Sequence, residues 1–352
     1  MTALLQRIGE AGPITVERYM ELALLDPDHG YYTRKYPFGA AGDFVTAPEI
    51  SQMFGELLGL WCYAAWQAAG SPHPAMLVEL GPGSGTLMAD ALRAIESATG
   101  APQPFDIVLV EASARLAHRQ REVLSGRAVS WCSAVEELPS RRPAFVIANE
   151  FFDALPVRQF VRTAAGWQER LVMVEDDVIA FVLGMVTGSL AASLPDAQTG
   201  RVCETSPVRD GLMRDLAAKL ATEGGAMLVI DFTAPGMPVR DTLQAVRHHR
   251  HADRLTAPGE ADLAAAVDFA ALGRIARAEG LEAFGPVSQG AFLEELGIAV
   301  RAERLKRSAP PETAHGIDLE LQRLTSPDAM GEDFRVMALL PAGTVAPAGF
   351  DG

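Results

Sequence analysis

A glycine-rich segment is the part of this sequence best suited to hold a ligand. It follows an apolar run that predicts a strand, precedes a predicted helix and reads Glu79-Leu80-Gly81-Pro82-Gly83-Ser84-Gly85. Glycine at three alternate positions lets the backbone turn tightly and approach a ligand closely. The dinucleotide-binding fingerprint needs glycine or alanine at position 86, where this chain has Thr86. A nicotinamide enzyme is therefore disfavoured.

The three glycines, with Glu79 two residues before the first, have the spacing typical of S-adenosylmethionine-dependent methyltransferases. That cofactor has no pyrophosphate, so the loop need only pass close to its amino-acid end and its ribose. A carboxylate at the end of the next strand should hold the ribose hydroxyls, because it can accept two hydrogen bonds from a diol. Glu111 has this place, directly after the apolar run 107–110. The alternative is an ordinary tight turn between a strand and a helix.

A second polar segment follows the fourth predicted strand and reads Asn149-Glu150-Phe151-Phe152-Asp153-Ala154-Leu155-Pro156. In open α/β sheets the ligand binds at the carboxyl ends of the strands, so this segment should face the group that is transferred. Asn149 and Glu150 could orient a nitrogen nucleophile. Phe151 or Phe152 could keep water from the sulfonium. The alternative is a polar loop with two core phenylalanines.

Apolar runs that alternate with helical patterns must position these residues. Six of them predict strands, with a seventh around 283–284: 76–80, 107–110, 129–131, 145–148, 226–230 and 334–340. Purely apolar strands separated by helices are typical of a parallel sheet covered on both faces. We expect an α/β fold with a doubly wound, Rossmann-like sheet of seven strands.

The chain should divide into an N-terminal helical segment and loop (1–70) and a larger domain (71–352). Gly39 and Gly42 mark the loop, and one helix shows an apolar face at Val16, Tyr19, Met20, Ala23 and Leu24. Two insertions, at about 156–222 and 235–325, interrupt the strand–helix alternation. The first predicts strands at 159–163, 167–174 and 178–183, the last buried and followed by a loop. The second predicts irregular structure and helices, including an alanine-rich helix at 261–271.

Charge and cysteine content narrow the classes of partner. The formal net charge is −15, which argues against nucleic acid and favours a cationic partner such as an arginine-bearing protein segment, although it could simply maintain solubility. Cys62, Cys132 and Cys203 are far apart, so we expect no disulfide, no zinc site and a reducing, cytoplasmic location. The uncharged run 178–195 is too short and broken to span a membrane.

Several motifs together resemble the MidA family of class I methyltransferases. They comprise the glycine loop and the segments 30–32, 38–56, 148–156, 241–244, 258–262, 267–269, 285–290 and 330–331. The family includes a mitochondrial arginine methyltransferase that acts in complex I assembly. The resemblance implies a class I methyltransferase fold, adenosylmethionine as cofactor, and a protein arginine as methyl acceptor, with a respiratory complex I subunit as a candidate.

Methyl transfer to arginine would need carboxylates, because a protonated guanidinium is a poor nucleophile that must be oriented and must lose a proton. The candidates for catalysis are Glu150 and Asp153, with Asn149 beside them. Asp43 and Glu49 from the N-terminal loop, with Phe151, are candidates for the substrate side. Asn149 is also a candidate cofactor contact, together with Glu79, the three loop glycines and Glu111.

Three departures from the family pattern affect the surroundings of the site. Cys132-Ser133 replaces a His-Asp pair near the adenine, Phe232-Thr233 replaces Tyr-Gly, and Ala266 replaces a histidine. The departures at Cys132, Ser133 and Ala266 leave open a rival hypothesis, a non-catalytic assembly factor that binds a partner subunit and keeps the cofactor pocket. His248, His249 and His251 lie in a mostly basic run, whereas a metal site needs carboxylate or thiol partners at ligand spacing, so we expect no metal site.

Overall fold

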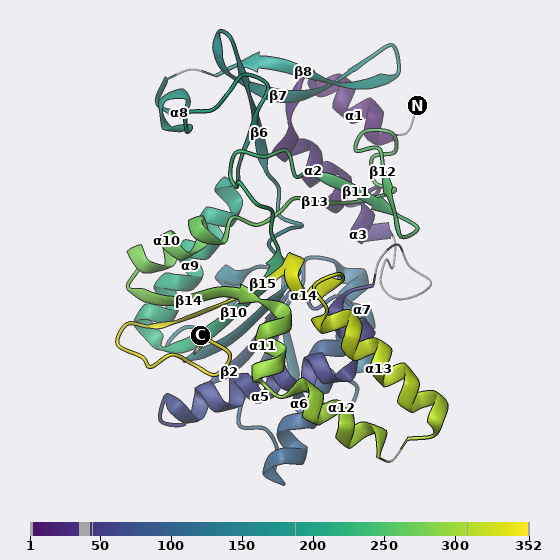
Figure 1. Cartoon of the computed structure of the whole chain (residues 1–352). Coiled ribbons are helices and arrows are strands. Elements are labelled where there is room, and N and C mark those ends of the chain that lie inside the picture. Colours follow the sequence, from purple (N-terminus) through teal and green to yellow (C-terminus); the bar gives the residue numbers. More distant parts are fainter. Residues whose placement is uncertain (1–2, 35–42, 44, 187, 308, 351–352) are drawn as a thin grey trace. The chain divides into compact units, whose positions relative to one another are not determined.

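The computed structural model describes residues 3–34, 43, 45–186, 188–307 and 309–350 (Figure 1). The chain forms two compact units. The sheet unit comprises Val45–Phe151, Leu212–Phe232 and Phe269–Gly352, and the accessory unit comprises Met1–Phe44, Phe152–Gly211 and Thr233–Asp268. These two units differ from the expected domains, 1–70 and 71–352. The expected domain boundary therefore stays a prediction. The glycine-marked loop at 35–42 lies outside the described residues.

The sheet unit contains a seven-stranded sheet in the order β14-β15-β10-β5-β2-β3-β4. The strands are β2 (Met76–Leu80), β3 (Asp106–Val110), β4 (Val129–Cys132), β5 (Ala144–Asn149), β10 (Gly225–Phe232), β14 (Leu281–Ser288) and β15 (Phe334–Pro341). All seven were expected, and the α/β class is confirmed. The sheet is mostly parallel, as expected, while β15 runs antiparallel to β10 and β14 antiparallel to β15. An apolar strand pattern reports burial and not direction.

Helices accompany this sheet, and most of them contribute to its apolar core. They are α4 (Ala47–Ile50), α5 (Gln52–Ala68), α6 (Thr86–Thr99), α7 (Ala114–Val123), α10 (Phe269–Ala278), α11 (Gln289–Glu295), α12 (Ile298–Lys306), α13 (Pro311–Thr325) and α14 (Met330–Asp333). A short 3₁₀ turn, η1, covers Val135–Glu137, and α9 (Pro207–Glu223) precedes β10. Helices α5 and α6 approach closely at Gly59, where an added Cβ would lie 2.5 Å from the Cα of Ala91.

The accessory unit is built on two small antiparallel sheets. One contains β1 (Ile14–Thr15), β6 (Arg158–Thr163), β7 (Gly166–Glu175), β8 (Val178–Met185) and β9 (Val202–Thr205), and the other contains β11 (Gln244–Arg247), β12 (Arg250–Ala252) and β13 (Asp262–Ala264). The side chain of Thr15 caps the start of helix α2 (Val16–Leu25), and the helix buries the five residues expected on its apolar face. Helices α1 (Ala3–Ala11), α3 (Tyr31–Arg34) and α8 (Gly188–Ser193) complete the unit.

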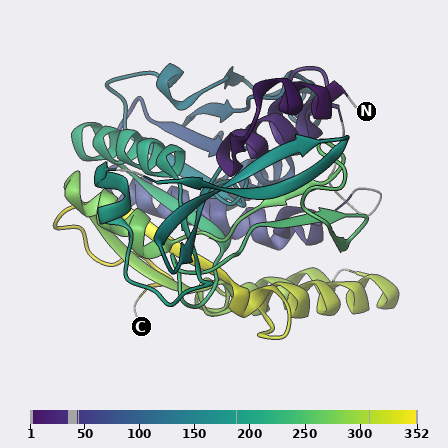
Figure 2. The ribbon, with the colours of Figure 1, turned by 90° about the horizontal axis from the view of Figure 1, so that it is seen from above.

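Three details of the two insertions were predicted wrongly. Strand β8 forms a long ribbon with β7 (Figure 1 and Figure 2) but is not buried, since Val178 is 63% exposed and Met185 85%. The short helix α8 follows it in place of a loop. The alanine-rich run at 261–271 is not one helix, because β13 pairs with β11 and α10 begins only at Phe269. β11 and β12 themselves were not expected. The helices described here include none that is long and apolar enough to cross a membrane.

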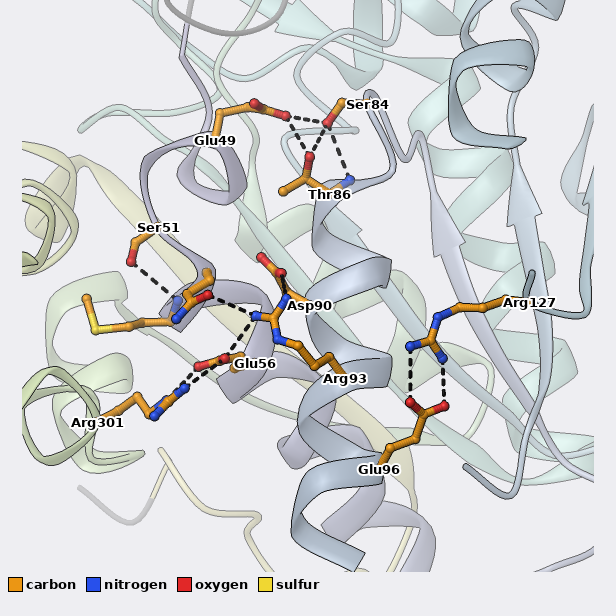
Figure 3. Close-up of polar contacts among 12 residues, drawn as sticks. Glu49, Ser51, Glu56, Ser84, Thr86, Asp90, Arg93, Glu96, Arg127 and Arg301 are labelled. Carbon is orange, nitrogen blue, oxygen red and sulfur yellow. Dashed lines mark hydrogen bonds and ion pairs between the residues drawn. The ribbon is translucent and has the colours of Figure 1, made fainter. Parts of the chain in front are cut away.

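A buried carboxylate ties three helices of the sheet unit together. Glu56 on α5 accepts hydrogen bonds from Arg93 on α6 and, through both of its oxygens, from Arg301 on α12 (Figure 3). Burial alone would raise the pKa of Glu56, but the two guanidinium groups outweigh this and hold that pKa below its usual range. The contribution to stability is therefore present at neutral pH and is lost as the pH falls through the lowered pKa.

We expect Glu56→Gln to lower the free energy of unfolding by about 1–3 kcal/mol, because charged hydrogen bonds around a buried group are lost. Urea unfolding at pH 7 measures this change. The matched control is Glu96→Gln, which weakens the half-exposed pair with Arg127 (Figure 3) and should cost less than about 1 kcal/mol. Equal losses in the two variants would contradict a special role for Glu56.

Candidate functional site

The glycine loop joins β2 to α6 in a backbone conformation that other residues rarely adopt. Gly81, Gly83 and Gly85 have φ of 59°, 53° and 85°. A Cβ added at Gly81 would lie 2.7 Å from Cδ2 of Phe151, which is closer than real side chains approach. The loop therefore requires glycine at these positions, and it brings the backbone next to the segment that follows β5.

Glu79 is buried on β2, one residue before the strand ends. Burial raises the pKa of its carboxyl well above the usual range, a backbone hydrogen bond from Met88 opposes this, and the nearby Glu111 adds to the increase. Its Oε2 atom is buried and has no hydrogen-bond partner among the described residues. A buried acceptor without a partner is costly, so a donor from a ligand would stabilise it.

Asn149, the last residue of β5, has the same property. Its Nδ2 donates to Oε1 of Glu150 at 3.3 Å, while its buried Oδ1 has no partner in the described part of the chain. Strands β2 and β5 are parallel neighbours, with Leu80 opposite Ala148, so Glu79 and Asn149 lie at the same edge of the sheet. Two acceptors without donors fit the α-ammonium group of adenosylmethionine, which carries three N–H donors.

Glu111 stands directly after β3, as the sequence predicts. Its Oε1 accepts from the backbone N–H of Ser113 at 2.8 Å, and its Oε2 accepts from Nε2 of Gln120 at 2.9 Å. Burial raises the pKa of Glu111 to about 7, although both hydrogen bonds oppose the increase. Each carboxylate oxygen can accept more than one hydrogen bond, so the group retains capacity for a ribose diol.

Gln120 on α7 is a part of this site that sequence reasoning missed. Its side chain is fully buried. Nε2 donates to the carbonyl of Gly83 at 3.0 Å as well as to Glu111, and Oε1 accepts from Nε1 of Trp131 at 3.0 Å. A signal exists in the sequence: Gln120 is four residues after Leu116, on the buried face of an otherwise polar helix.

Glu150 has a strained backbone, with φ of 48°. For a residue with a long side chain this conformation is unfavourable and is often found at functional sites. Its N–H donates to the carbonyl of Ile230 at 2.8 Å, and its Oε1 accepts from the backbone N–H of Ala47 at 3.2 Å as well as from Asn149. The carboxylate thus anchors the start of α4 at the carboxyl end of β5.

Glu49 on α4 contacts the glycine loop directly (Figure 3). One of its oxygens accepts from the hydroxyls of Ser84 and Thr86, the latter at 3.1 Å, and these hydroxyls also contact each other at 2.8 Å. Two carboxylates therefore hold the segment around α4: Glu49 fixes it to the glycine loop, and Glu150 fixes it to the end of β5.

The other two candidate carboxylates belong to the accessory unit. Asp43 accepts from the hydroxyl of Tyr31 and the N–H of His248, both at 2.8 Å. Burial raises the pKa of Asp153 to about 6, with Arg209 acting in the opposite direction. Burial and the charges of Asp153 and Asp43 raise the pKa of Asp262 to about 7. Glu49 and Glu150 thus belong to the sheet unit, and Asp43 and Asp153 to the accessory unit.

Three of the residues that differ from the family pattern, Ser133, Thr233 and Ala266, form hydrogen bonds within the chain. The backbone N–H of Ser133 donates to Glu137 at 3.0 Å, and the Ser133 hydroxyl donates to it at 2.5 Å. Thr233 donates its hydroxyl to the carbonyl of Val267 at 2.8 Å, and the N–H of Ala266 donates to the hydroxyl of Thr242 at 2.9 Å. The part of the chain that the structure describes holds no cluster of metal-ligating side chains.

Comparison with known proteins gives consistent results. Residues 57–287 match the family described as "Putative S-adenosyl-L-methionine-dependent methyltransferase". The chain is 37% identical to "Protein arginine methyltransferase NDUFAF7, mitochondrial" of Rattus norvegicus over 96% of its length and 83% of the relative. The Homo sapiens protein of the same name is 36% identical over 96% and 82%.

A solved structure covers nearly the whole chain. It is a "likely methyl transferase" of Burkholderia thailandensis bound to S-adenosyl-homocysteine, with a TM-score of 0.86 and 31% identity, covering 99% of this chain and 94% of the other. The class I methyltransferase fold and adenosylmethionine as cofactor are confirmed. The expectation of a cytoplasmic location is contradicted, since the curated relatives are named as mitochondrial proteins.

Proposed function

Because the chain belongs to this family of S-adenosylmethionine-dependent methyltransferases, as its motifs predicted, we propose that it methylates an arginine side chain of a protein. The observation that carries the proposal is the 37% identity to a protein arginine methyltransferase along 96% of the chain. A net charge of −15 and carboxylates beside the glycine loop are also suited to a cationic acceptor.

For the cofactor, the proposed contacts follow from the acceptors at the sheet edge. Glu79 and Asn149 would accept hydrogen bonds from its ammonium group, because each has a buried oxygen without a partner among the described residues. Glu111 would hold the ribose. The backbone of Gly81, Gly83 and Gly85 would pass beside the ligand.

For the acceptor, the proposed catalytic groups are Glu150 and Asp153, with Asn149 as an orienting amide. The cofactor supplies a methyl group activated on a sulfonium. As a guanidinium nitrogen forms its bond to the methyl carbon and the carbon–sulfur bond breaks, one N–H proton must leave the nitrogen. A carboxylate fixed at the carboxyl end of β5 can orient the guanidinium and accept that proton.

Asp43, Glu49 and Phe151 remain proposed substrate-side residues. Glu49 and Asp43 also make structural contacts. Glu49 binds the glycine loop at Ser84, and Asp43 accepts from the backbone N–H of His248. As the protein substrate we propose a respiratory complex I subunit, on the resemblance of the motifs alone.

The test is to incubate the purified protein and methyl-labelled adenosylmethionine with a lysate from a strain that lacks the gene. Mass spectrometry of the labelled proteins should find methylated arginine, with a complex I subunit among the products. Label on lysine or on small molecules only would overturn the proposed acceptor. Cofactor binding by calorimetry without any transfer would favour a non-catalytic assembly factor.

We expect Glu111→Ala to weaken binding of S-adenosylhomocysteine by roughly 1–3 kcal/mol, the cost of leaving polar partners unpaired. Isothermal titration calorimetry measures the change, and circular dichroism verifies the fold. Glu122→Ala is the matched control, since this exposed carboxylate lies on α7 and pairs only with His118 and Arg119 among the ion pairs described. An unchanged affinity in Glu111→Ala would remove Glu111 from the cofactor site.

A further inference from the structure

The side chain of Gln120 connects three elements around the ribose end of the proposed cofactor site. It lies on α7 and contacts the glycine loop at Gly83, Glu111 after β3, and Trp131 on β4. In sequence these partners are 37, 9 and 11 residues away. Its burial is complete, so these contacts are not exchanged with solvent.

The chemistry of its partners determines the orientation of the amide. An indole N–H can only donate, so Trp131 must face the Oε1 atom. A carbonyl and an ionised carboxylate only accept, so with Glu111 ionised, Gly83 and Glu111 must each take one of the two N–H groups of Nε2. A flipped amide would present its oxygen to two acceptors. All three contacts are therefore satisfied in one orientation only.

We propose that Gln120 is a positioning residue for cofactor binding, which holds the glycine-loop carbonyl and the ribose-binding carboxylate of Glu111 at a fixed separation. This inference rests on the cofactor site described above. The two N–H groups of Nε2 connect the carbonyl oxygen of Gly83 in the glycine loop to the carboxylate of Glu111. Trp131 prevents the amide from rotating, and Arg121 covers the Trp131 ring at 4.7 Å.

The hydrogen bond that Gln120 donates to Oε2 of Glu111 also favours the ionised form of this carboxyl. With this hydrogen bond in place, burial still raises the pKa of Glu111 to about 7. The other titratable groups on the elements around Glu111 are Glu79 on β2, Cys132 at the end of β4, and five exposed groups on α7, Arg115, His118, Arg119, Arg121 and Glu122. Glu79 and Cys132 supply no positive charge that could replace the donor, and Arg121 is exposed over the indole.

The ribose diol donates hydrogen bonds to the ionised carboxylate. Cofactor affinity in the parent protein should therefore be highest above pH 7 and should decrease as the pH falls below 7. Loss of the Gln120 donor would raise the pKa of Glu111 further and move this midpoint to higher pH. Affinity at pH 7 should then drop by roughly tenfold, the size expected for one lost hydrogen bond to a charged group, and should recover in part at pH 9.

The experiment is titration calorimetry of S-adenosylhomocysteine against the full chain from pH 6 to pH 9. Gln120→Met keeps the volume and removes all three contacts, and Gln120→Glu keeps the acceptor for Trp131 but places a second carboxylate beside Glu111. Both should move the midpoint upward. Trp131→Phe removes only the N–H that orients the amide, so it should move the midpoint less. This third variant provides a test if the two Gln120 variants fold poorly.

The control is His118→Gln on the same helix, whose side chain is 77% exposed and should leave the profile unchanged. A lower affinity with an unmoved midpoint in every Gln120 variant would show a merely structural role and overturn the proposal. Failure of the parent protein to bind S-adenosylhomocysteine would instead overturn the cofactor site itself, so the two failures are distinguishable.

Discussion

Gly81→Ala should abolish measurable cofactor binding, with a loss of roughly a hundredfold or more. Two costs combine at this position. The φ of 59° is unfavourable for any residue with a Cβ, by about 1–2 kcal/mol. The added Cβ would also lie 2.7 Å from the ring of Phe151. Relief requires either the loop or Phe151 to move, and both line the proposed site. Calorimetry with S-adenosylhomocysteine measures the effect.

The control for this variant separates backbone strain from the close contact. Gly100 caps the far end of α6 with φ of 66°, and an added Cβ would meet no atom within 4 Å. Gly100→Ala should therefore lose about 1 kcal/mol of stability and bind the cofactor normally. If Gly81→Ala bound as tightly as Gly100→Ala, with both folded by circular dichroism, the cofactor would bind elsewhere.

Local patterns predicted much of the fold, including the strands that carry the site. Helix α2 shows one apolar face at helical spacing, and the five central strands are apolar runs bounded by turns. Glu79 and Glu111 were placed at strand ends, and the carboxyl ends of parallel strands share one edge of a sheet. Both steps need only the spacing of residues along the chain and a general rule of topology.

Contacts between distant segments were beyond such reasoning. Glu49 is still proposed for the substrate side, but its contacts with Ser84 and Thr86, which follow it by 35 and 37 residues, were not predicted. Gln120 resembles an ordinary polar helix residue until Gly83 and Trp131 are brought beside it. Strand β8 is apolar enough for a core, but its exposure depends on which neighbours the fold supplies, and among the described strands it pairs only with β7.

Glu150→Gln should leave cofactor affinity nearly unchanged and reduce turnover by about 10²–10⁴-fold, the range for a positioned acid–base group. The glutamine side chain has the same length, and its Oε1 can still accept from the N–H of Ala47 and the Nδ2 of Asn149. The start of α4 should thus stay anchored, and the change isolates the negative charge. Calorimetry measures binding, and labelled-methyl transfer to the identified substrate measures turnover.

Asp176→Asn is a suitable control for this variant, because it also removes one carboxylate from a residue with φ of 48° but lies in the exposed turn between β7 and β8. Its turnover should equal that of the parent protein, which excludes a general effect of net charge or of amide substitution at a strained position. An equal loss of cofactor affinity in Glu150→Gln would place Glu150 at the cofactor and not at the acceptor. Full turnover would refute the assignment and leave Asp153 as the proton acceptor to test next, since burial raises its pKa to about 6 and brings it close to physiological pH.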